Sequence, residues 1–261
     1  MSADDLHALQ HPISGVVVIV LVDYLRQHQA WGWLRLVAGG GPLMRDIAGL
    51  QFVKVMGSGQ DGGFSLRPSP SHQGLICSFD HWSSAVNFLR GAHVKGMVER
   101  AREWWYGIFA VRSARGQWDR QAWAPTSDAV LQEASGTKPH PDLLGVLTRA
   151  NIRPAKAMAF WRHAPAAQAD LNIAPGCEIA VGLGEAPLVR QCTFSLWQDT
   201  QSMTHYAQER AHLQAIQAAY RHEFFSESLF VRMHLLNMYG VWKERMHAYG
   251  ATQLLEVRHG T

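Results

Sequence analysis

Apolar and polar positions along the first half of the chain follow strand-like and helix-like periods in turn. Residues 16–22 form a continuous β-branched run, which is typical of a buried strand. The later patterns predict a helix at 25–37, strands at 50–56 and 74–79, a helix at 83–102 and a strand at 104–111. The first half is therefore predicted to have the order β-α-β-β-α-β.

The same order of patterns returns in the second half. Strands are predicted at 146–153, 177–183, 190–197 and 230–238, with helical stretches at 155–171 and 199–228. The Glu-Trp-Trp sequence that begins at Glu103 has an echo in the Glu-Phe-Phe sequence that begins at Glu223, and Val-Arg follows each at the same spacing. This echo favours an internal duplication.

Two β-α-β-β-α-β units in one chain define the predicted fold class. Each unit is ferredoxin-like, and a second copy can cover the open face of the first sheet. We therefore predict an α+β fold in which two tandem ferredoxin-like (βαββαβ) halves form a dimeric-type α+β barrel, with a pocket between the sheets. The expected parts are a flexible N-terminus (1–14), the first half (15–118), a linker or long loop (119–145), the second half (146–242) and a C-terminal tail (243–261).

Composition narrows the classes of protein to which the chain can belong. With 261 residues, 47% hydrophobic and 17% charged, it can bury a large core and is not a disordered chain. A formal charge of +3 is too small to indicate nucleic-acid binding. The three cysteines form no CxxC pair, and no apolar run approaches the ~20 residues of a membrane span. We expect a soluble, cytoplasmic protein.

Several short motifs resemble known functional sites, but the residues around them exclude those sites. Residues 57–62 satisfy G-x-G-x-x-G, but Pro68 and Pro70 follow where a nucleotide-binding helix would have to continue. His222 and Glu223 begin an H-E-x-x-H pattern that ends in Ser226 instead of histidine. Glu185 is either a buried acid or a residue that closes a tight turn. Hydrolytic and zinc chemistry are therefore not expected.

One histidine and two arginines are candidates for a functional site. His212 lies at helical spacing from Ala215 and Ile216, so a small apolar face would let a flat macrocycle approach the imidazole. The alternative is a partly buried histidine on an alanine-rich helix. Arg149 and Arg153 are four residues apart on a predicted strand and point to the same side, either into the inter-sheet pocket or toward the surface.

Several ordered motifs resemble the spheroidene monooxygenases of carotenoid biosynthesis. They span about residues 16–233 and are densest from residue 147 onward. They include LTRANIRP (147–154), FWR (160–162), GLGEAPL (182–188), QCTFSLWQD (191–199), FSESL (225–229) and, in the first half, SARGQW (113–118). The connection at 119–143 and the region after about 241 fall outside the resemblance.

The resemblance implies a haem-dependent monooxygenase that places a keto group in an acyclic carotenoid, of the spheroidene or hydroxyspheroidene type, with O2 and a ferredoxin-type electron donor. It makes His212 the expected proximal ligand of haem b iron and gives Arg149 and Arg153 catalytic roles in the pocket. Ala215, Ile216, Arg115 and Trp161 are then expected to bind the cofactor.

The resemblance, together with the composition and the many tryptophans, gives the expected partners and location. The partners are the electron donor, the apolar substrate and, transiently, a membrane surface, with no nucleic acid; a homo-oligomer stays open. The location is the cytoplasm, with peripheral contact at the inner membrane. Two other functions stay open: another haem enzyme on the same fold, similar to an aldoxime dehydratase, and a non-catalytic protein that binds haem or an apolar ligand.

Overall fold

The structure is a computed structural model that describes residues 12–39, 46–134, 139–162, 170–186, 188–209, 221–250 and 254–255. Its strands are β1 (Val16–Tyr24), β2 (Leu50–Gly59), β3 (Pro68–Phe79), β4 (Ala101–Trp118), β5 (Gln121–Ala122), β6 (Leu144–Ile152), β7 (Cys177–Ala186), β8 (Arg190–Trp197), β9 (Phe225–Trp242) and β10 (Arg245–Tyr249). Its helices are α1 (Gln29–Ala38), α3 (Trp82–Arg90), α4 (Ala92–Val98), α5 (Asp128–Glu133) and α7 (Thr200–Gln208). Short 3-10 turns lie at Arg26–His28, Gln60–Gly62, Pro154–Lys156 and Asp170–Ile173, and residues 157–162 are helical.

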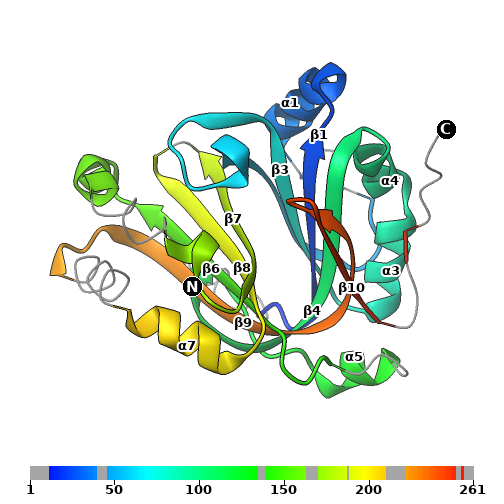
Figure 1. Cartoon of the computed structure of the whole chain (residues 1–261). Coiled ribbons are helices and arrows are strands. Elements are labelled where there is room, and N and C mark those ends of the chain that lie inside the picture. Colours follow the sequence, from blue (N-terminus) through cyan, green and yellow to red (C-terminus); the bar gives the residue numbers. More distant parts are fainter. Residues whose placement is uncertain are drawn as a thin grey trace, which may run out of the picture.

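The strands close into an antiparallel barrel with helices outside it (Figure 1). The first half has the strand order β2-β3-β1-β4, and the second half repeats it as β7-β8-β6-β9. The halves join where β2 meets β7 over a short stretch and where β4 pairs with β9 along most of its length. The predicted α+β barrel of two ferredoxin-like halves is confirmed.

The boundaries of several predicted elements change. The prediction that residues 199–228 are helical is wrong at its C-terminal end, because β9 already begins at Phe225. From Glu227 to Leu235 every second residue points into the barrel, which is the period of a strand. The predicted linker (119–145) carries β5 and α5, and the predicted tail (243–261) carries β10, while the division into domains stays a prediction.

The structure confirms a repeat between the halves but changes its register. Glu103 accepts hydrogen bonds from the backbone N–H groups of Lys243 and Glu244 at the β9–β10 turn, at 2.9 and 3.0 Å. Glu227 does the same for Asp119 and Arg120 at the β4–β5 turn, at 3.0 and 2.6 Å. All four turn residues have positive φ, as in a type I′ turn. The counterpart of Glu103 is thus Glu227, four residues beyond the Glu223 that the sequence echo indicated.

Three groups of buried apolar side chains form the core. One fills the barrel, one lies between the first half of the sheet and α3 and α4, and the third lies under α7 on the second half. Among the described residues, no helix combines the length and the apolar character that crossing a bilayer requires.

Candidate functional site

The inside of the barrel is packed with side chains. Trp105, Phe109 and Phe194 contact one another there, with ring centroids 5.6–6.3 Å apart. A Cβ atom on Gly145 of β6 would lie 2.8 Å from the Phe109 ring, so this aromatic side chain of β4 reaches the backbone of β6, beyond the intervening β9. An eight-stranded barrel is just wide enough for its own side chains. The expected pocket between the sheets is therefore wrong for the described residues.

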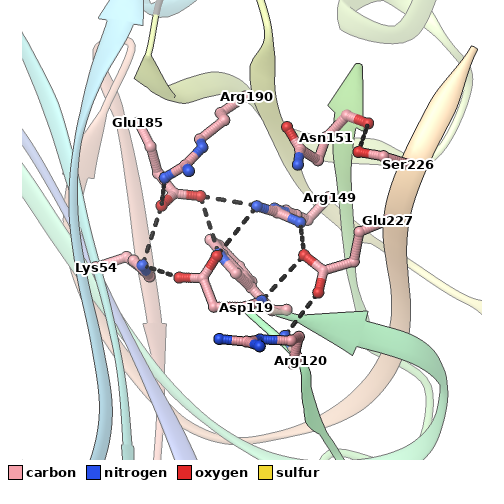
Figure 2. Close-up of polar contacts among 10 residues, drawn as sticks. Lys54, Asp119, Arg120, Arg149, Asn151, Glu185, Arg190, Ser226 and Glu227 are labelled. Atoms are coloured by element: carbon pink, nitrogen blue, oxygen red, sulfur yellow. Dashed lines mark hydrogen bonds and ion pairs between the residues drawn. The ribbon is translucent and has the colours of Figure 1, made fainter. Parts of the chain in front are cut away.

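One end of the barrel contains a cluster of charged side chains, which we call the Arg149 cluster: Lys54, Asp119, Arg149, Glu185 and Glu227 (Figure 2). The Arg149 side chain is 1% exposed and pairs with Glu227; its Nη2 lies 3.4 Å from Asp119 Oδ1 and its Nε 3.6 Å from Glu185 Oε1. The Lys54 Nζ pairs with Asp119 and lies 3.0 Å from Glu185 Oε2. The cluster therefore joins residues of both halves.

The charges in the Arg149 cluster stabilise one another. Burial lowers the pKa of Lys54, but the hydrogen bond with Asp119 and the charge of Glu185 outweigh it, so the pKa is raised. Burial raises the pKa of Asp119, but Lys54 and then Arg149 outweigh it, so the pKa is lowered. Trp118 Nε1 donates to Glu185 Oε1 at 2.9 Å. These contacts fit a group that closes the barrel end more than one that receives a substrate.

The two candidate arginines lie apart. Arg149 shares the inner face of β6 with Leu147, whereas Arg153 follows the end of β6, is exposed and donates from Nε to the carbonyl oxygen of Glu223 at 3.1 Å. Glu185 was expected to be either a buried acid or a residue that closes a tight turn. In the structure it is a largely buried acid within the Arg149 cluster. The sequence analysis did not identify Lys54 and Glu227 as members of a site. Both residues alternate along their strands with apolar residues that point into the barrel, and this period of two is the signal that could have identified them.

A second candidate site lies on the outer face of the second half. Phe230 of β9 is 37% exposed and is the cross-strand neighbour of Thr148 on β6 and of Arg115 on β4. The Arg232 guanidinium lies over the Phe230 ring, 5.5 Å from its centroid. Its Nε is buried and has no hydrogen-bond partner among the described residues. We call Arg115, Thr148, Phe230 and Arg232 the outer patch.

Helix α7 covers the neighbouring part of the same outer face, where its side chains pack with Leu144 and Val146 of β6. Tyr206 of α7 packs on Trp197 at 5.3 Å. Trp161 is buried in the helical stretch 157–162, and its Nε1 donates to the carbonyl oxygen of Leu188 at 2.9 Å. Beside Phe224 is a hollow of about 350 Å³, lined by Lys156, Ala159, Arg221, His222, Glu223 and Phe224. Both cofactor candidates that the structure describes, Arg115 and Trp161, thus belong to the outer side of the barrel.

The other cofactor candidates, His212, Ala215 and Ile216, lie outside the described residues. Within the described part of the chain, no group of three or more His, Cys, Asp or Glu side chains could hold a metal ion. Ser69, His72 and Asp23 come close together, but Ser69 Oγ and Asp23 Oδ1 both approach His72 Nδ1, at 2.9 and 3.6 Å. A hydrolytic triad needs the two ring nitrogens for different partners.

Comparison with known proteins gives clear relatives. No family model matches the chain. It is 41% identical over 233 residues to the spheroidene monooxygenase of Rubrivivax gelatinosus, covering 89% of this chain and 86% of that protein. It is 31% identical to the spheroidene monooxygenase of Rhodobacter capsulatus, covering 81% and 86%. A crystal structure of aldoxime dehydratase shares the fold, with a TM-score of 0.53, 10% identity and coverage of 84% and 81%.

Proposed function

Since this chain belongs to the spheroidene monooxygenase family, we propose that it places a keto group in an acyclic carotenoid of the spheroidene or hydroxyspheroidene type, using haem b, O2 and a reduced ferredoxin. The chain is an oxidoreductase, a monooxygenase by family. The observation that carries the proposal is the 41% identity to a spheroidene monooxygenase over 89% of the chain.

The outer patch has the chemistry that a haem requires. Phe230 offers an exposed apolar ring, and Arg115 and Arg232 bring two guanidinium groups to its neighbourhood. Guanidinium groups bind carboxylates such as haem propionates well, and no residue that the structure describes forms a hydrogen bond with the buried Arg232 Nε. We propose that these side chains hold the propionates and one face of the macrocycle, with Trp161 packing nearby.

The axial ligand completes the proposed site. Haem iron is commonly held by one proximal histidine, and His212 is the residue that we propose for it, beside Ala215 and Ile216. A bound haem would supply the activation of O2. Catalytic roles for Arg149 and Arg153 stay predictions, since Arg149 points into the barrel and away from the outer patch.

The overall reaction consists of two hydroxylations of one methylene carbon followed by loss of water. Each hydroxylation consumes one O2, two electrons and two protons and releases one water. The ferredoxin supplies the electrons, and the resulting geminal diol loses water to give the ketone. The chain's own task is to hold the polyene so that one carbon reacts twice, and positioning of this kind supplies a large part of catalysis.

An absorption spectrum of the chain purified from cells supplied with a haem precursor tests the proposal. We expect a Soret band that shifts with dithionite and carbon monoxide, and ketone formation when carotenoid, ferredoxin and its reductase are added. His212→Ala should lose haem and activity together, while His205→Ala, at an exposed position on α7, should keep both. A chain that takes up no haem even on titration, or a His212→Ala variant with full haem, contradicts the assignment.

A further inference from the structure

Helix α1 is apolar on two opposite sides, and the barrel covers one of them. Trp31 packs edge-on against Tyr24, with ring centroids 5.7 Å apart, and the Arg35 guanidinium lies over the Trp31 ring. A Cβ atom on Gly32 would lie 2.7 Å from the Tyr24 ring, so the helix backbone packs closely on the barrel there. This side fixes the orientation of α1 and leaves the other side facing outward.

The outward side of α1 carries Trp33, Leu34 and Val37, which we call the α1 ridge. Leu34 is 71% exposed and Val37 80%, and the Trp33 ring is partly exposed. An apolar helix is normally buried all round, so a ridge of this kind indicates a partner. Figure 1 shows α1 at the top of the molecule, away from α7.

The charge around α1 favours an anionic partner. No Asp or Glu occurs between Asp23 and Asp46, and Arg26 lies exposed just before the helix, while Arg35 is buried on the side that faces the barrel. Tryptophan is enriched where protein meets the lipid interface, because its ring is apolar and its N–H is polar. An exposed basic residue next to an apolar helix face fits an interfacial helix on anionic lipid.

We propose that the α1 ridge docks the protein on the surface of an anionic lipid bilayer. The inference rests on the proposed function, because an acyclic carotenoid dissolves in lipid and must be collected there. A second copy of the chain fits the ridge less well: three side chains offer roughly 300–400 Å², and stable pairs bury about 800 Å² per partner.

Co-sedimentation of the full chain with phosphatidylcholine vesicles that contain about one-third phosphatidylglycerol tests the ridge. Leu34→Gln with Val37→Gln keeps good helix formers and should weaken vesicle binding about tenfold. The matched control is Met158→Gln with Ile173→Gln, at apolar residues that are 70% and 80% exposed on the other half. It should bind like the natural chain. Equal binding by all three proteins, or an equal loss in both variants, overturns the inference.

A second assay separates this inference from the proposed function. With carotenoid in vesicles the α1 variant should show a KM about tenfold higher and an unchanged kcat, and with carotenoid in detergent micelles it should match the natural chain. Turnover in micelles without vesicle binding overturns the ridge and leaves the proposed function intact. Vesicle binding through α1 without turnover in either medium overturns the proposed function and leaves the α1 ridge intact. A natural chain that is dimeric by light scattering, and a variant that is monomeric, would assign the ridge to a second copy and overturn the proposal.

Discussion

Replacing Arg149 by methionine should lower the free energy of unfolding by about 3–5 kcal/mol at pH 7. The Arg149 guanidinium faces the carboxylates of Asp119, Glu185 and Glu227, and its side chain is almost fully buried. Methionine fills a similar volume but carries no charge, so Lys54 alone would remain among three carboxylates in the Arg149 cluster. Removing one partner of a buried ion pair is costly because it leaves the other charge uncompensated.

Two further variants show whether burial and pairing are the cause. Arg190 also lies near Glu185, at 3.8 Å, but it is exposed, so Arg190→Met should cost only about 0–1 kcal/mol. Combining Arg149→Met with Glu227→Gln removes one uncompensated charge. The double variant should therefore be more stable than the sum of the single effects by about 0.5–3 kcal/mol.

Urea unfolding followed by tryptophan fluorescence measures these changes as shifts of the midpoint at constant slope. The pH dependence has a defined sign. The folded pKa of Asp119 lies below its unfolded value of about 3.9, since Lys54 and Arg149 outweigh burial. Its pairing therefore stabilises the fold above that pH and is lost as pH falls through the folded pKa, so the deficit of Arg149→Met should shrink below about pH 4. A deficit at pH 7 no larger than that of Arg190→Met would refute the reasoning.

Three other predictions concern the turn, the barrel and the thiols. Glu244→Gly should stabilise the chain by about 0.5–1 kcal/mol, because residue 244 has φ of 62°, and a lower Tm would contradict this. Gly145→Ala should destabilise by about 1–3 kcal/mol through the contact with Phe109, and an unchanged urea midpoint would speak against a filled barrel. Cys77 and Cys192 are fully buried, and burial raises the pKa of each thiol. A thiol reagent at pH 8 should therefore modify them only when the chain unfolds. Rapid modification of the folded chain, seen by mass spectrometry, would contradict this.

The sequence predicted the barrel because each strand carries its own local pattern. Residues 16–22 form a strand in the structure, and the order of elements in each half determines how the sheets pair. The alternation of apolar and polar residues along a strand was less useful for predicting which face of the strand points into the barrel. In a barrel covered by helices both faces of a strand are buried, so every residue of β1 is buried and no face stands out as polar.

Which charged side chains meet in the Arg149 cluster could not be predicted, because the contacts connect distant parts of the chain. Arg149 and Glu227 are separated by most of the second half, and Lys54 comes from the other half. A single sequence shows that each residue lies on a strand, but not which charged side chains share one end of the barrel. The repeat register failed for a similar reason: Glu103 and Glu227 are equivalent through the turns that they cap, whereas the echo at Glu223 is only a similarity of residue types.

The two halves share a topology, but their outer faces differ, and this difference favours the second half as the place for the proposed cofactor. On the first half the outward side chains of β1, such as Val18 and Val20, are fully buried in the core that α3 and α4 cover. On the second half the corresponding face carries exposed Thr148 and Phe230, with Arg232 beside them. A flat ligand on the first half would have to displace packed core, whereas on the second half it would cover apolar surface and reach an arginine Nε to which no described residue is hydrogen-bonded. The barrel and the first half therefore fit the role of a scaffold, and the part of the second half's outer face beyond the core under α7, where Thr148 and Phe230 are exposed, offers a place for a ligand without loss of core packing.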